Sequence, residues 1–234
     1  MLGADGGAPG IMQNFAHGIL LAGGRGVRLG AAVPKALVEL DGVTLLDRSI
    51  ATLRECCDDV IVVAPVSVEL GGIAARRVFD GDSHEGPLAG LVAALEACDG
   101  ETAAILGVDF PLVSSALLRD MANCLAAEPP ADAVIARPGG IAQPLVSVMR
   151  VRAKAALRAA FDEGVRSMHG GLARLNVRWL DDEWLAQHAG GAKALLNVNT
   201  PGDLAAAQRA LAQQVPAQTP LPQPSPAPRR EGVA

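Results

Sequence analysis

The sequence predicts a single α/β domain in which helices cover both faces of a mostly parallel sheet. Short apolar runs of β type alternate along the chain with segments whose apolar residues recur at helical spacing, and this alternation is typical of βαβ units. The chain has 234 residues, of which 50% are hydrophobic. A domain of this size buries enough surface to fold without support from a metal or a disulfide.

The predicted strands are short, and several are apolar throughout, as expected for a sheet that is buried on both faces. The first covers residues 17–21 (HGILL), and the second covers residues 60–63 (VIVV). Later apolar runs predict further strands at residues 77–79, 104–108, 134–136 and 145–148.

The predicted helices lie between these strands and after them. One helical face recurs at i, i+4, i+7 and i+11 and consists of Leu46, Ile50, Leu53 and Cys57. The next face consists of Leu88, Leu91, Val92 and Leu95. Ser114 opens a further helix, and another covers residues 152–161. Thr200 and Asp203 form a capping box with Pro201 at the first helical position, which predicts the start of the last helix.

The folded domain is predicted to cover residues 17–214. Residues 1–16 are rich in Gly and Ala without periodicity, and we expect a loose extension there. From Val215 to Pro228 proline recurs about every second residue, which excludes a helix or a central strand and favours extended polyproline II structure. We therefore expect residues 215–234 to form a disordered tail or, alternatively, a docking peptide for a partner.

Composition and charge argue against two classes of function. The net charge is −5 and the aromatic content is 3%, whereas a nucleic-acid-binding protein presents a basic stripe and stacking aromatic side chains. The longest apolar stretches are far shorter than the roughly 18–20 residues that cross a bilayer. No basic residue precedes Arg25, so no signal peptide is indicated. We expect a cytoplasmic protein with no nucleic-acid partner and no membrane partner.

The cysteines do not indicate a metal centre. Zinc sites use cysteine and histidine at short, regular spacing, but Cys56, Cys57, Cys98 and Cys124 form no C-x-x-C pair and have no histidine at ligand spacing. We interpret them as small core residues of a protein in a reducing compartment.

Glycine and charged residues follow three of the predicted strands. The Gly-rich segment from Ala22 to Gly30 follows the first strand and leads to Lys35, while Asp80 follows the third strand and Asp109 follows the fourth. In sheets of this kind ligands bind beyond the carboxyl ends of the strands. We therefore expect a basic, Gly-rich loop and two carboxylates to meet at one edge of the sheet.

The Gly-rich loop matches neither standard phosphate motif. The dinucleotide pattern G-x-G-x-x-G, started at Gly24, has Leu29 in place of its last glycine, and the P-loop pattern lacks its Lys-Ser/Thr pair. The failed glycine spacing argues against a nicotinamide-dependent oxidoreductase. The loop still suits phosphate groups, because glycines let backbone N–H groups point inward together and Arg25, Arg28 and Lys35 add positive charge. The alternative is a solvated glycine turn.

The two aspartates each have a functional and a structural interpretation. Asp109 is placed where a carboxylate could bind a hard cation such as Mg²⁺, which takes one or two protein carboxylates together with phosphate oxygens and water. The alternative is a turn-forming aspartate before Phe110 and Pro111. Asp80 could accept a hydrogen bond from a ligand or could be a solvated loop residue.

A set of short motifs occurs in a fixed order along the predicted domain. They are residues 21–24 (LAGG), 28–30 (RLG), Lys35, 86–90 (GPLAG), 109–111 (DFP), 143–145 (QPL) and 197–201 (NVNTP). As an ordered set they resemble molybdenum cofactor guanylyltransferases, over about residues 18–212. The resemblance implies a Rossmann-like nucleotidyltransferase domain that transfers GMP from GTP to the terminal phosphate of molybdopterin, with Mg²⁺.

The resemblance also implies roles for individual residues. The nucleotide would be bound by Leu21, Ala22, Gly23, Gly24, Lys35, Asp80 and Asp109. The catalytic residues would be Lys35, Arg28 and Asp109. Within these sets the backbone of residues 21–23 would line the nucleotide, Lys35 would hold the triphosphate, Asp80 would contact the guanosine and Asp109 would also bind Mg²⁺. Asn197 and Asn199 would lie near the pterin substrate or, alternatively, form only the turn before the last helix.

Some residues depart from the family pattern and keep other functions open. Ala64 and Pro65 stand where the family often has an asparagine that touches the nucleotide, and Pro34 is more typical of sugar-nucleotide and isoprenoid nucleotidyltransferases. Gly23 and the two asparagines favour guanylyl over cytidylyl transfer. The alternatives are a related enzyme that uses CTP or another NTP, one that acts on a sugar phosphate, an isoprenoid phosphate or phospholactate, and a non-catalytic nucleotide-binding protein. Protein partners would be other molybdenum cofactor biosynthesis proteins or a target molybdoenzyme.

Overall fold

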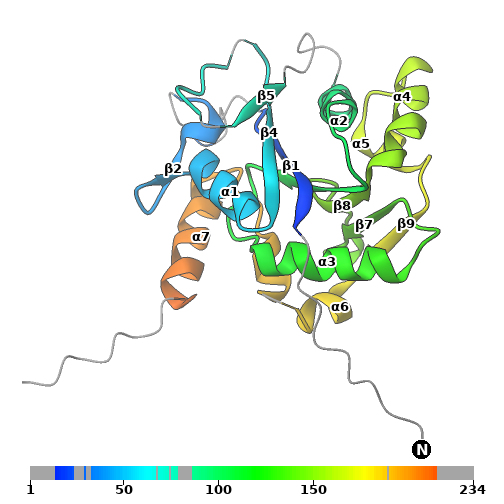
Figure 1. The fold of residues 1–234 in the computed structure, drawn as a ribbon. Helices are drawn as coiled ribbons and strands as arrows, with labels where there is room; N and C mark the ends of the chain where they lie inside the picture. The colour runs from blue at the N-terminus through cyan, green and yellow to red at the C-terminus, as the bar shows by residue number, and fades with distance from the viewer. Residues whose placement is uncertain are drawn as a thin grey trace, which may run out of the picture.

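The computed structural model describes residues 14–23, 29, 33–66, 68–73, 75–78, 86–188 and 190–214. Within these residues a seven-stranded sheet forms the centre of the molecule, and helices pack on both of its faces (Figure 1). The strand order is β5–β4–β1–β6–β8–β7–β9. The bounds are β1 Phe15–Leu21, β4 Cys57–Val63, β5 Arg76–Val78, β6 Thr102–Gly107, β7 Ala133–Ala136, β8 Val146–Arg150 and β9 Val177–Leu180.

Parallel pairing predominates in this sheet, as predicted. β1 lies between β4 and β6 and is parallel to both, β5 is parallel to β4, and β9 is parallel to β7. β8 is the exception, because it runs antiparallel to both β6 and β7. Leu21 pairs with Val63 on one side and with Gly107 on the other. The strands β4, β1 and β6 therefore end together, and we call this end of the sheet the carboxyl edge.

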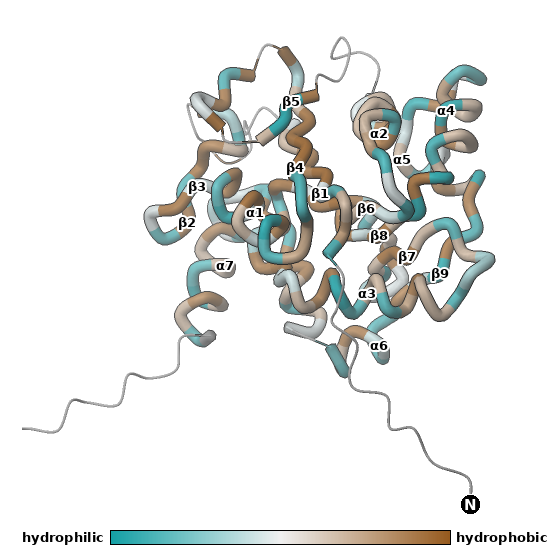
Figure 2. The backbone as a smooth tube through the Cα atoms, viewed as in Figure 1, coloured by the Kyte–Doolittle hydropathy of each residue, from teal (hydrophilic) through white to brown (hydrophobic). Residues whose placement is uncertain are grey.

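Two hydrophobic cores hold the helices against the sheet. One core receives buried residues from α1 (Leu45–Arg54), α3 (Ser115–Ala127), α6 (Asp182–Ala186) and α7 (Pro201–Gln214). The other receives them from α2 (Pro87–Glu96), α4 (Lys154–Asp162) and α5 (Met168–Leu172). Because successive strand residues point to opposite faces, Leu20 lies in the first core and Ile19 in the second. Hydrophobic residues are concentrated along β4 and β1 at the centre of the molecule (Figure 2).

Polar side chains cap several of the helices, and two of these starts, at Ser114 and Thr200, are predicted by the sequence. Thr44 Oγ1 accepts the N–H of Asp47 at 3.0 Å at the start of α1, and Ser114 Oγ accepts the N–H of Leu117 at 3.2 Å at the start of α3. Each bond satisfies a donor that the first helical turn leaves free. The predicted capping box at residues 200–203 likewise precedes α7.

Cys57 does not lie on the helix that its spacing predicts. α1 ends at Arg54, residues 55–56 form a turn, and Cys57 begins β4, where it pairs with Phe15. The helical spacing is misleading here because Cys57 packs into the same core as Leu53. It reaches that core from the sheet instead of from the helix.

Other predicted boundaries shift by a few residues. β1 begins at Phe15, ahead of the predicted domain start at residue 17. The strand predicted at 77–79 is β5, and Phe79 lies outside the described residues. The helix predicted at 152–161 begins as a 3₁₀ turn before α4. Elements too short to give a periodic signal are β2 (Glu39–Leu40), β3 (Val43–Thr44), α5, α6, β9 and the 3₁₀ turns η2 (Lys35–Leu37), η3 (Pro138–Gly140), η4 (Val151–Ala153) and η5 (Gly191–Leu195).

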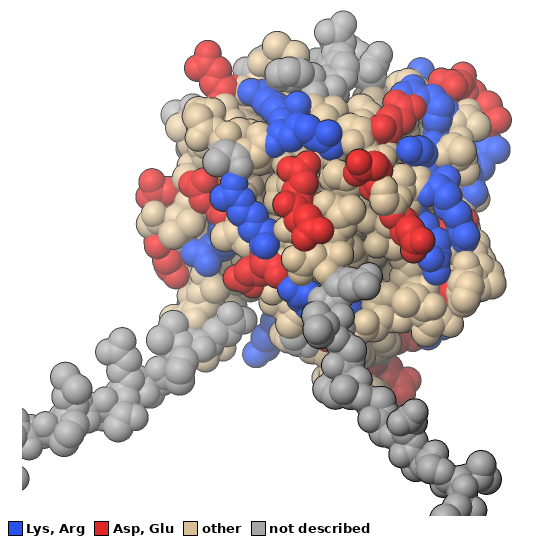
Figure 3. All heavy atoms as spheres, viewed as in Figure 1, with Lys and Arg blue, Asp and Glu red and all other residues tan. Residues whose placement is uncertain are grey.

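The cysteines lie in or beside the core, and charged side chains lie at the surface. Cys56, Cys57 and Cys98 are buried and Cys124 is partly buried, all as free thiols, which confirms their interpretation as core residues. On the face shown in Figure 3, acidic and basic side chains are interspersed. In the part of the chain that the structure describes, no helix has both the length and the apolar character needed to cross a membrane.

Candidate active site

Lys35 lies at the centre of a polar cluster at the carboxyl edge. The residue begins η2, and its side chain is only 9% exposed. Its Nζ donates to Oδ1 of Asn199 at 2.6 Å and to Oδ2 of Asp109 at 3.2 Å. An ammonium group has three N–H donors. Two of them have acceptors among the described residues.

Asp109 is held at the end of β6 by main-chain hydrogen bonds. The N–H of Phe110 bonds to the carbonyl of Gly107 at 3.1 Å and closes a tight turn, while the N–H of Val198 bonds to the carbonyl of Asp109 at 2.8 Å. The second bond ties residues 197–199 to the end of β6. A Cβ atom at Gly107 would lie 2.5 Å from Oδ1 of Asp109, so only glycine leaves room for the carboxylate in this position.

The two predicted acceptor-binding residues join the same cluster. Nδ2 of Asn199 donates to Oδ1 of Asn197 at 2.6 Å, and Oδ1 of Asn199 accepts from Lys35. We call Lys35, Asp109, Asn197 and Asn199 the Lys35 cluster. Its members come from three segments that are far apart in the sequence, and the structure brings them together as the sequence predicts.

The cluster pairs one ammonium group with one carboxylate where little water reaches them. The side chains of Lys35 and Asp109 are 9% and 16% exposed. Charges interact more strongly in such a site than at the surface, and removing one member of a buried pair typically costs about 3–5 kcal/mol because the other is left uncompensated. The pair can therefore bind an anion through Lys35 and a cation through Asp109 without a net charge of its own.

Two of the backbone groups predicted to line the nucleotide, at the end of β1, are already hydrogen-bonded to neighbouring strands. The N–H of Ala22 donates to the carbonyl of Val63 at 2.8 Å, and the carbonyl of Leu21 accepts the N–H of Val108 at 3.1 Å. These groups hold neighbouring strands together, whereas Gly23 is exposed at the carboxyl edge. Three further predicted residues, Gly24, Arg28 and Asp80, lie outside the described residues, and their roles stay predictions.

Asp109 fits the donor chemistry of Mg²⁺, which prefers hard oxygen ligands and is commonly bound by one or two carboxylates with phosphate oxygens and water. Among the described residues, no group of three or more His, Cys, Asp or Glu side chains could hold a metal ion.

Other residues support the site although the sequence does not reveal their roles. The N–H of Gly107 donates to the carbonyl of Leu145 at 2.7 Å, and a Cβ at Gly107 would lie 2.9 Å from Cβ of Leu145. In the first turn of α7, the carboxylate of Asp203 accepts the N–H of Thr200, the residue that follows Asn199. Leu145 belongs to the QPL motif and Asp203 to the capping box. Neither pattern shows which parts of the chain these two residues contact.

The motif at residues 86–90 forms the start of α2. Gly86 has a φ of +77°, a conformation that favours glycine, and a Cβ there would lie 2.7 Å from the carbonyl oxygen of Arg166. The same carbonyl accepts the N–H of Leu88 at 3.3 Å. The glycine of this motif is thus required by close packing between the start of α2 and the segment before α5.

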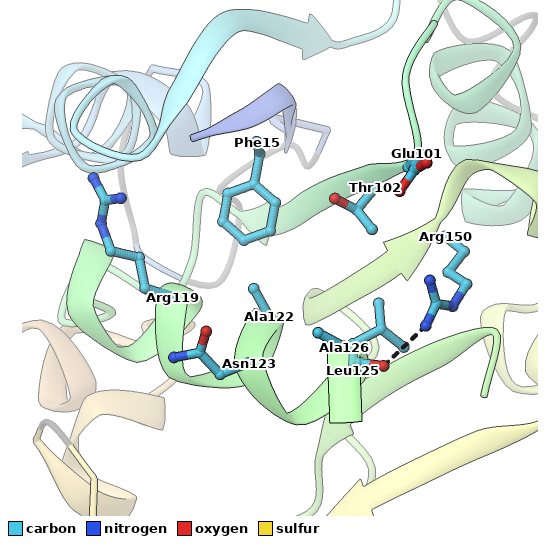
Figure 4. A pocket seen from close by; sticks show the side chains of 9 residues that line it. All are labelled: Phe15, Glu101, Thr102, Arg119, Ala122, Asn123, Leu125, Ala126 and Arg150. Atoms are coloured by element: carbon cyan, nitrogen blue, oxygen red, sulfur yellow. Dashed lines mark hydrogen bonds between the residues drawn. The ribbon is translucent and has the colours of Figure 1, made fainter. Parts of the chain in front are cut away.

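A cavity of about 260 Å³ lies at the opposite end of the sheet, which we call the amino edge. Phe15 and Thr102, the first residues of β1 and β6, point into it above α3 (Figure 4). Arg150, which pairs with Thr102, donates to the carbonyls of Leu125 and Ala131 at 3.0 Å each. No member of the Lys35 cluster lines this cavity.

Comparisons with known proteins show the family of this chain. A model of the MobA-like NTP transferase domain matches residues 18–178. A probable molybdenum cofactor guanylyltransferase from Chloroflexus aggregans is 34% identical over 196 residues, which cover 80% of this chain and 90% of that protein. A molybdenum cofactor guanylyltransferase from Pseudomonas syringae pv. syringae is 35% identical over 185 residues, which cover 78% of this chain and 88% of that protein.

A solved structure has the same fold. Molybdopterin-guanine dinucleotide biosynthesis protein A from Archaeoglobus fulgidus matches with a TM-score of 0.69, over 84% of this chain and 99% of that protein. The sequence identity is 23%, so this likeness concerns the fold. It agrees with the predicted α/β architecture.

Proposed function

Because the chain belongs to the MobA-like NTP transferase domain family, a family of nucleotidyltransferases, we propose that it transfers GMP from GTP to the terminal phosphate of molybdopterin. The names of its relatives support a guanylyl donor and a molybdenum cofactor acceptor. The observation that carries the proposal is the Lys35 cluster. It brings a phosphate-binding cation, a carboxylate and two amides to the carboxyl edge, where sheets of this kind bind their ligands.

The proposed reaction is an in-line displacement at the α-phosphorus of GTP. An oxygen of the acceptor phosphate forms a bond to that phosphorus, the bond to the β-phosphate oxygen breaks, and pyrophosphate leaves. The acceptor phosphate is already ionised near pH 7, because its second pKa is about 6, so the reaction needs no side-chain base. The main obstacle is the repulsion between two anions.

Lys35 is suited to reduce that repulsion. Its remaining N–H donor can bind the triphosphate while Asp109 and Asn199 fix the ammonium group in place. A fixed cation stabilises charge that develops on the leaving pyrophosphate more effectively than a mobile one. Asn197 and Asn199, joined by their own hydrogen bond, present amides that can orient the pterin part of the acceptor.

We propose Asp109 as the residue that holds Mg²⁺. When bound there, the metal supplies positive charge that neutralises the triphosphate. The carboxylate is anchored for this role by the turn at residues 107–110 and by the room that Gly107 leaves. The free thiols of the chain fit a reducing compartment, and we place the reaction in the cytoplasm.

The test is pyrophosphate release from GTP, CTP and UTP in turn, with Mg²⁺, in the presence and absence of molybdopterin. We expect release only when GTP and molybdopterin are both present. Mass spectrometry of the product should then show GMP added to molybdopterin.

The other outcomes separate the alternatives. Release with CTP would keep the transferase and overturn the guanylyl donor. Release only with a sugar phosphate, an isoprenoid phosphate or phospholactate as the acceptor would overturn the proposed acceptor. These compounds are included because Pro34 stands directly before Lys35. Binding of GTP without release by any acceptor would indicate a non-catalytic nucleotide-binding protein.

A further inference from the structure

The carboxylate of Asp203 accepts hydrogen bonds from two consecutive backbone N–H groups. Oδ2 accepts the N–H of Thr200 at 2.8 Å and the N–H of Asn199 at 3.0 Å, while Oγ1 of Thr200 accepts the N–H of Asp203 at 3.2 Å. The last two residues form the expected capping box. The bond to Asn199 reaches one residue beyond that box, into the Lys35 cluster.

The bond to Asn199 fixes a residue that has two other contacts in the cluster. Its side-chain oxygen accepts from Lys35 at 2.6 Å, and its side-chain nitrogen donates to Asn197 at 2.6 Å. Because Asp203 holds the backbone of Asn199, the side chain that makes both contacts starts from a fixed position. The hydrogen bond from Asn199 is also the main reason why the pKa of Asp203 lies below its ordinary value, and the charge of Lys35 contributes in the same direction.

A second capping box in the chain has the same residue types without this link. Thr44 precedes α1 and Asp47 lies in its first turn. Oγ1 of Thr44 accepts the N–H of Asp47 at 3.0 Å and donates to the Asp47 carboxylate at 2.6 Å. These bonds stay within the box. The Asp47 box therefore supports a helix, whereas the Asp203 box also supports the Lys35 cluster.

We propose that Asp203 is a positioning residue of the transferase site, which holds Asn199 so that its side chain can fix Lys35 and orient Asn197. This inference rests on the proposed function for its kinetic consequences. Its structural consequence is that loss of Asp203 leaves Lys35 less well fixed. This consequence does not depend on which substrates the enzyme uses.

The experiment compares Asp203→Ala with the matched control Asp47→Ala, and Asp203→Asn serves as a conservative variant that keeps a side-chain oxygen. Stability, kcat and the KM values for GTP and molybdopterin are measured for each. Asp203→Ala should lose more stability than Asp47→Ala, because it leaves the N–H groups of Asn199 and Thr200 without this acceptor, whereas Asp47→Ala removes only the acceptor of the Thr44 hydroxyl. Each variant keeps the bond to its capping threonine. Only Asp203→Ala should raise the KM for molybdopterin, by about tenfold, which corresponds to about 1.4 kcal/mol of lost positioning. Asp203→Asn should recover part of that loss.

A second measurement does not depend on activity. The rate at which the Lys35 amine is methylated by formaldehyde and a reductant is followed by peptide mass spectrometry, with Lys154 on α4 as the internal reference. We expect faster labelling of Lys35 in Asp203→Ala than in Asp203→Asn, and no change in Asp47→Ala. A difference between the two Asp203 variants separates lost positioning from lost charge, since both lack the carboxylate.

The proposal is overturned if Asp203→Ala and Asp47→Ala change KM and Lys35 labelling equally, or if the two Asp203 variants label Lys35 at the same rate. If the wild-type protein does not turn over GTP with molybdopterin, the proposed function fails, and the labelling rates alone then decide the role of Asp203. If Asp203→Ala does not fold, Asp203→Ser, whose shorter side chain does not reach the N–H of Asn199, takes its place in the comparison with Asp203→Asn: faster Lys35 labelling in Asp203→Ser supports the proposal, and equal labelling overturns it.

Discussion

The two edges of the sheet both carry charged side chains, but those side chains bond to different partners. At the carboxyl edge Lys35, Asp109 and Asn199 bond to one another through their side chains. At the amino edge Arg150 and Arg119 donate to main-chain carbonyls, those of Leu125, Ala131 and Glu55. The amino edge has a cavity of about 260 Å³, yet its arginines are engaged by the fold.

This contrast leads us to place the candidate site at the carboxyl edge and not in the cavity. An arginine that satisfies carbonyls at the ends of helices and loops stabilises the backbone, so its removal should change stability. At the carboxyl edge a charged pair and two amides lie together where sheets of this kind bind their ligands, so removal of one of them should change activity. The predictions below use this difference between the edges.

Asp109→Ala should have the largest effect, a loss of turnover of about 10²-fold or more, because it removes both the proposed metal ligand and the partner of Lys35. Steady-state pyrophosphate release at saturating Mg²⁺ measures it. Asp162→Ala, which removes an exposed carboxylate on α4, is the matched control and should keep wild-type turnover. Near-wild-type turnover of Asp109→Ala would remove Asp109 from the site.

Lys35→Met should weaken GTP binding by about tenfold or more, since a charge-assisted hydrogen bond contributes about 1.5–3 kcal/mol. The methionine keeps most of the apolar stem, so packing changes little. Calorimetric titration with GTP and Mg²⁺ measures the affinity, with Lys154→Met as the control. Unchanged GTP affinity together with an unchanged rate would contradict the role given to Lys35.

Gly107→Ala should lower turnover by about tenfold, because the added Cβ would displace the carboxylate of Asp109 from its position 2.5 Å away. Gly18→Ala is the matched control: its Cβ would lie 2.9 Å from Sγ of Cys57, in the middle of β1 and away from the Lys35 cluster. Both variants should lose stability, by about 1–3 kcal/mol. Equal turnover per folded molecule in the two variants would show that Gly107 serves only packing.

Arg150→Met tests the amino edge. It should lower the free energy of unfolding by about 1–3 kcal/mol, because two hydrogen bonds from a charged donor are lost, and it should leave turnover unchanged. The carbonyls of Leu125 and Ala131 each keep one other donor, the N–H of Glu128 and the guanidinium of Arg152. Urea denaturation and pyrophosphate release measure the two quantities. A clear loss of turnover with unchanged stability would indicate that the amino edge takes part in the reaction.

Asp99→Asn should have the smallest effect, on the pH dependence of stability. Asp99 bonds to His17 near the amino edge, and this hydrogen bond lowers the pKa of the Asp99 carboxyl below its ordinary value. A carboxyl whose folded pKa is lowered stabilises the protein above its unfolded pKa of about 3.9 and loses that contribution as the pH falls through the folded value. The Tm difference between wild type and variant should therefore shrink below about pH 4. A difference that grows with acidity would contradict the assignment.

The sequence was sufficient to predict most of the fold because alternating strands and helices are local patterns. It did not show the direction of β8, since direction depends on the connection between β7 and β8 and not on the residues of the strand. Cys57 was misplaced because one core receives residues from both α1 and β4.

The candidate site was predictable to the extent that it follows the ends of strands and the family motifs. These features identify Lys35, Asp109, Asn197 and Asn199, which the structure places together. The contributions of Gly107 and Asp203 depend on atoms brought close by the fold, which a local pattern does not contain. Gly24, Arg28 and Asp80 lie outside the described residues. A structure with bound nucleotide would test the predictions for them.

The most direct test of the difference between the two edges is amide hydrogen exchange with and without GTP and Mg²⁺. We predict that the nucleotide slows exchange at the carboxyl edge, in residues 21–23, 35–38 and 107–110, and leaves α3 residues 119–126 beside the amino-edge cavity unchanged. Protection confined to residues 119–126, with no change around Lys35 and Asp109, would contradict the assignment of the site.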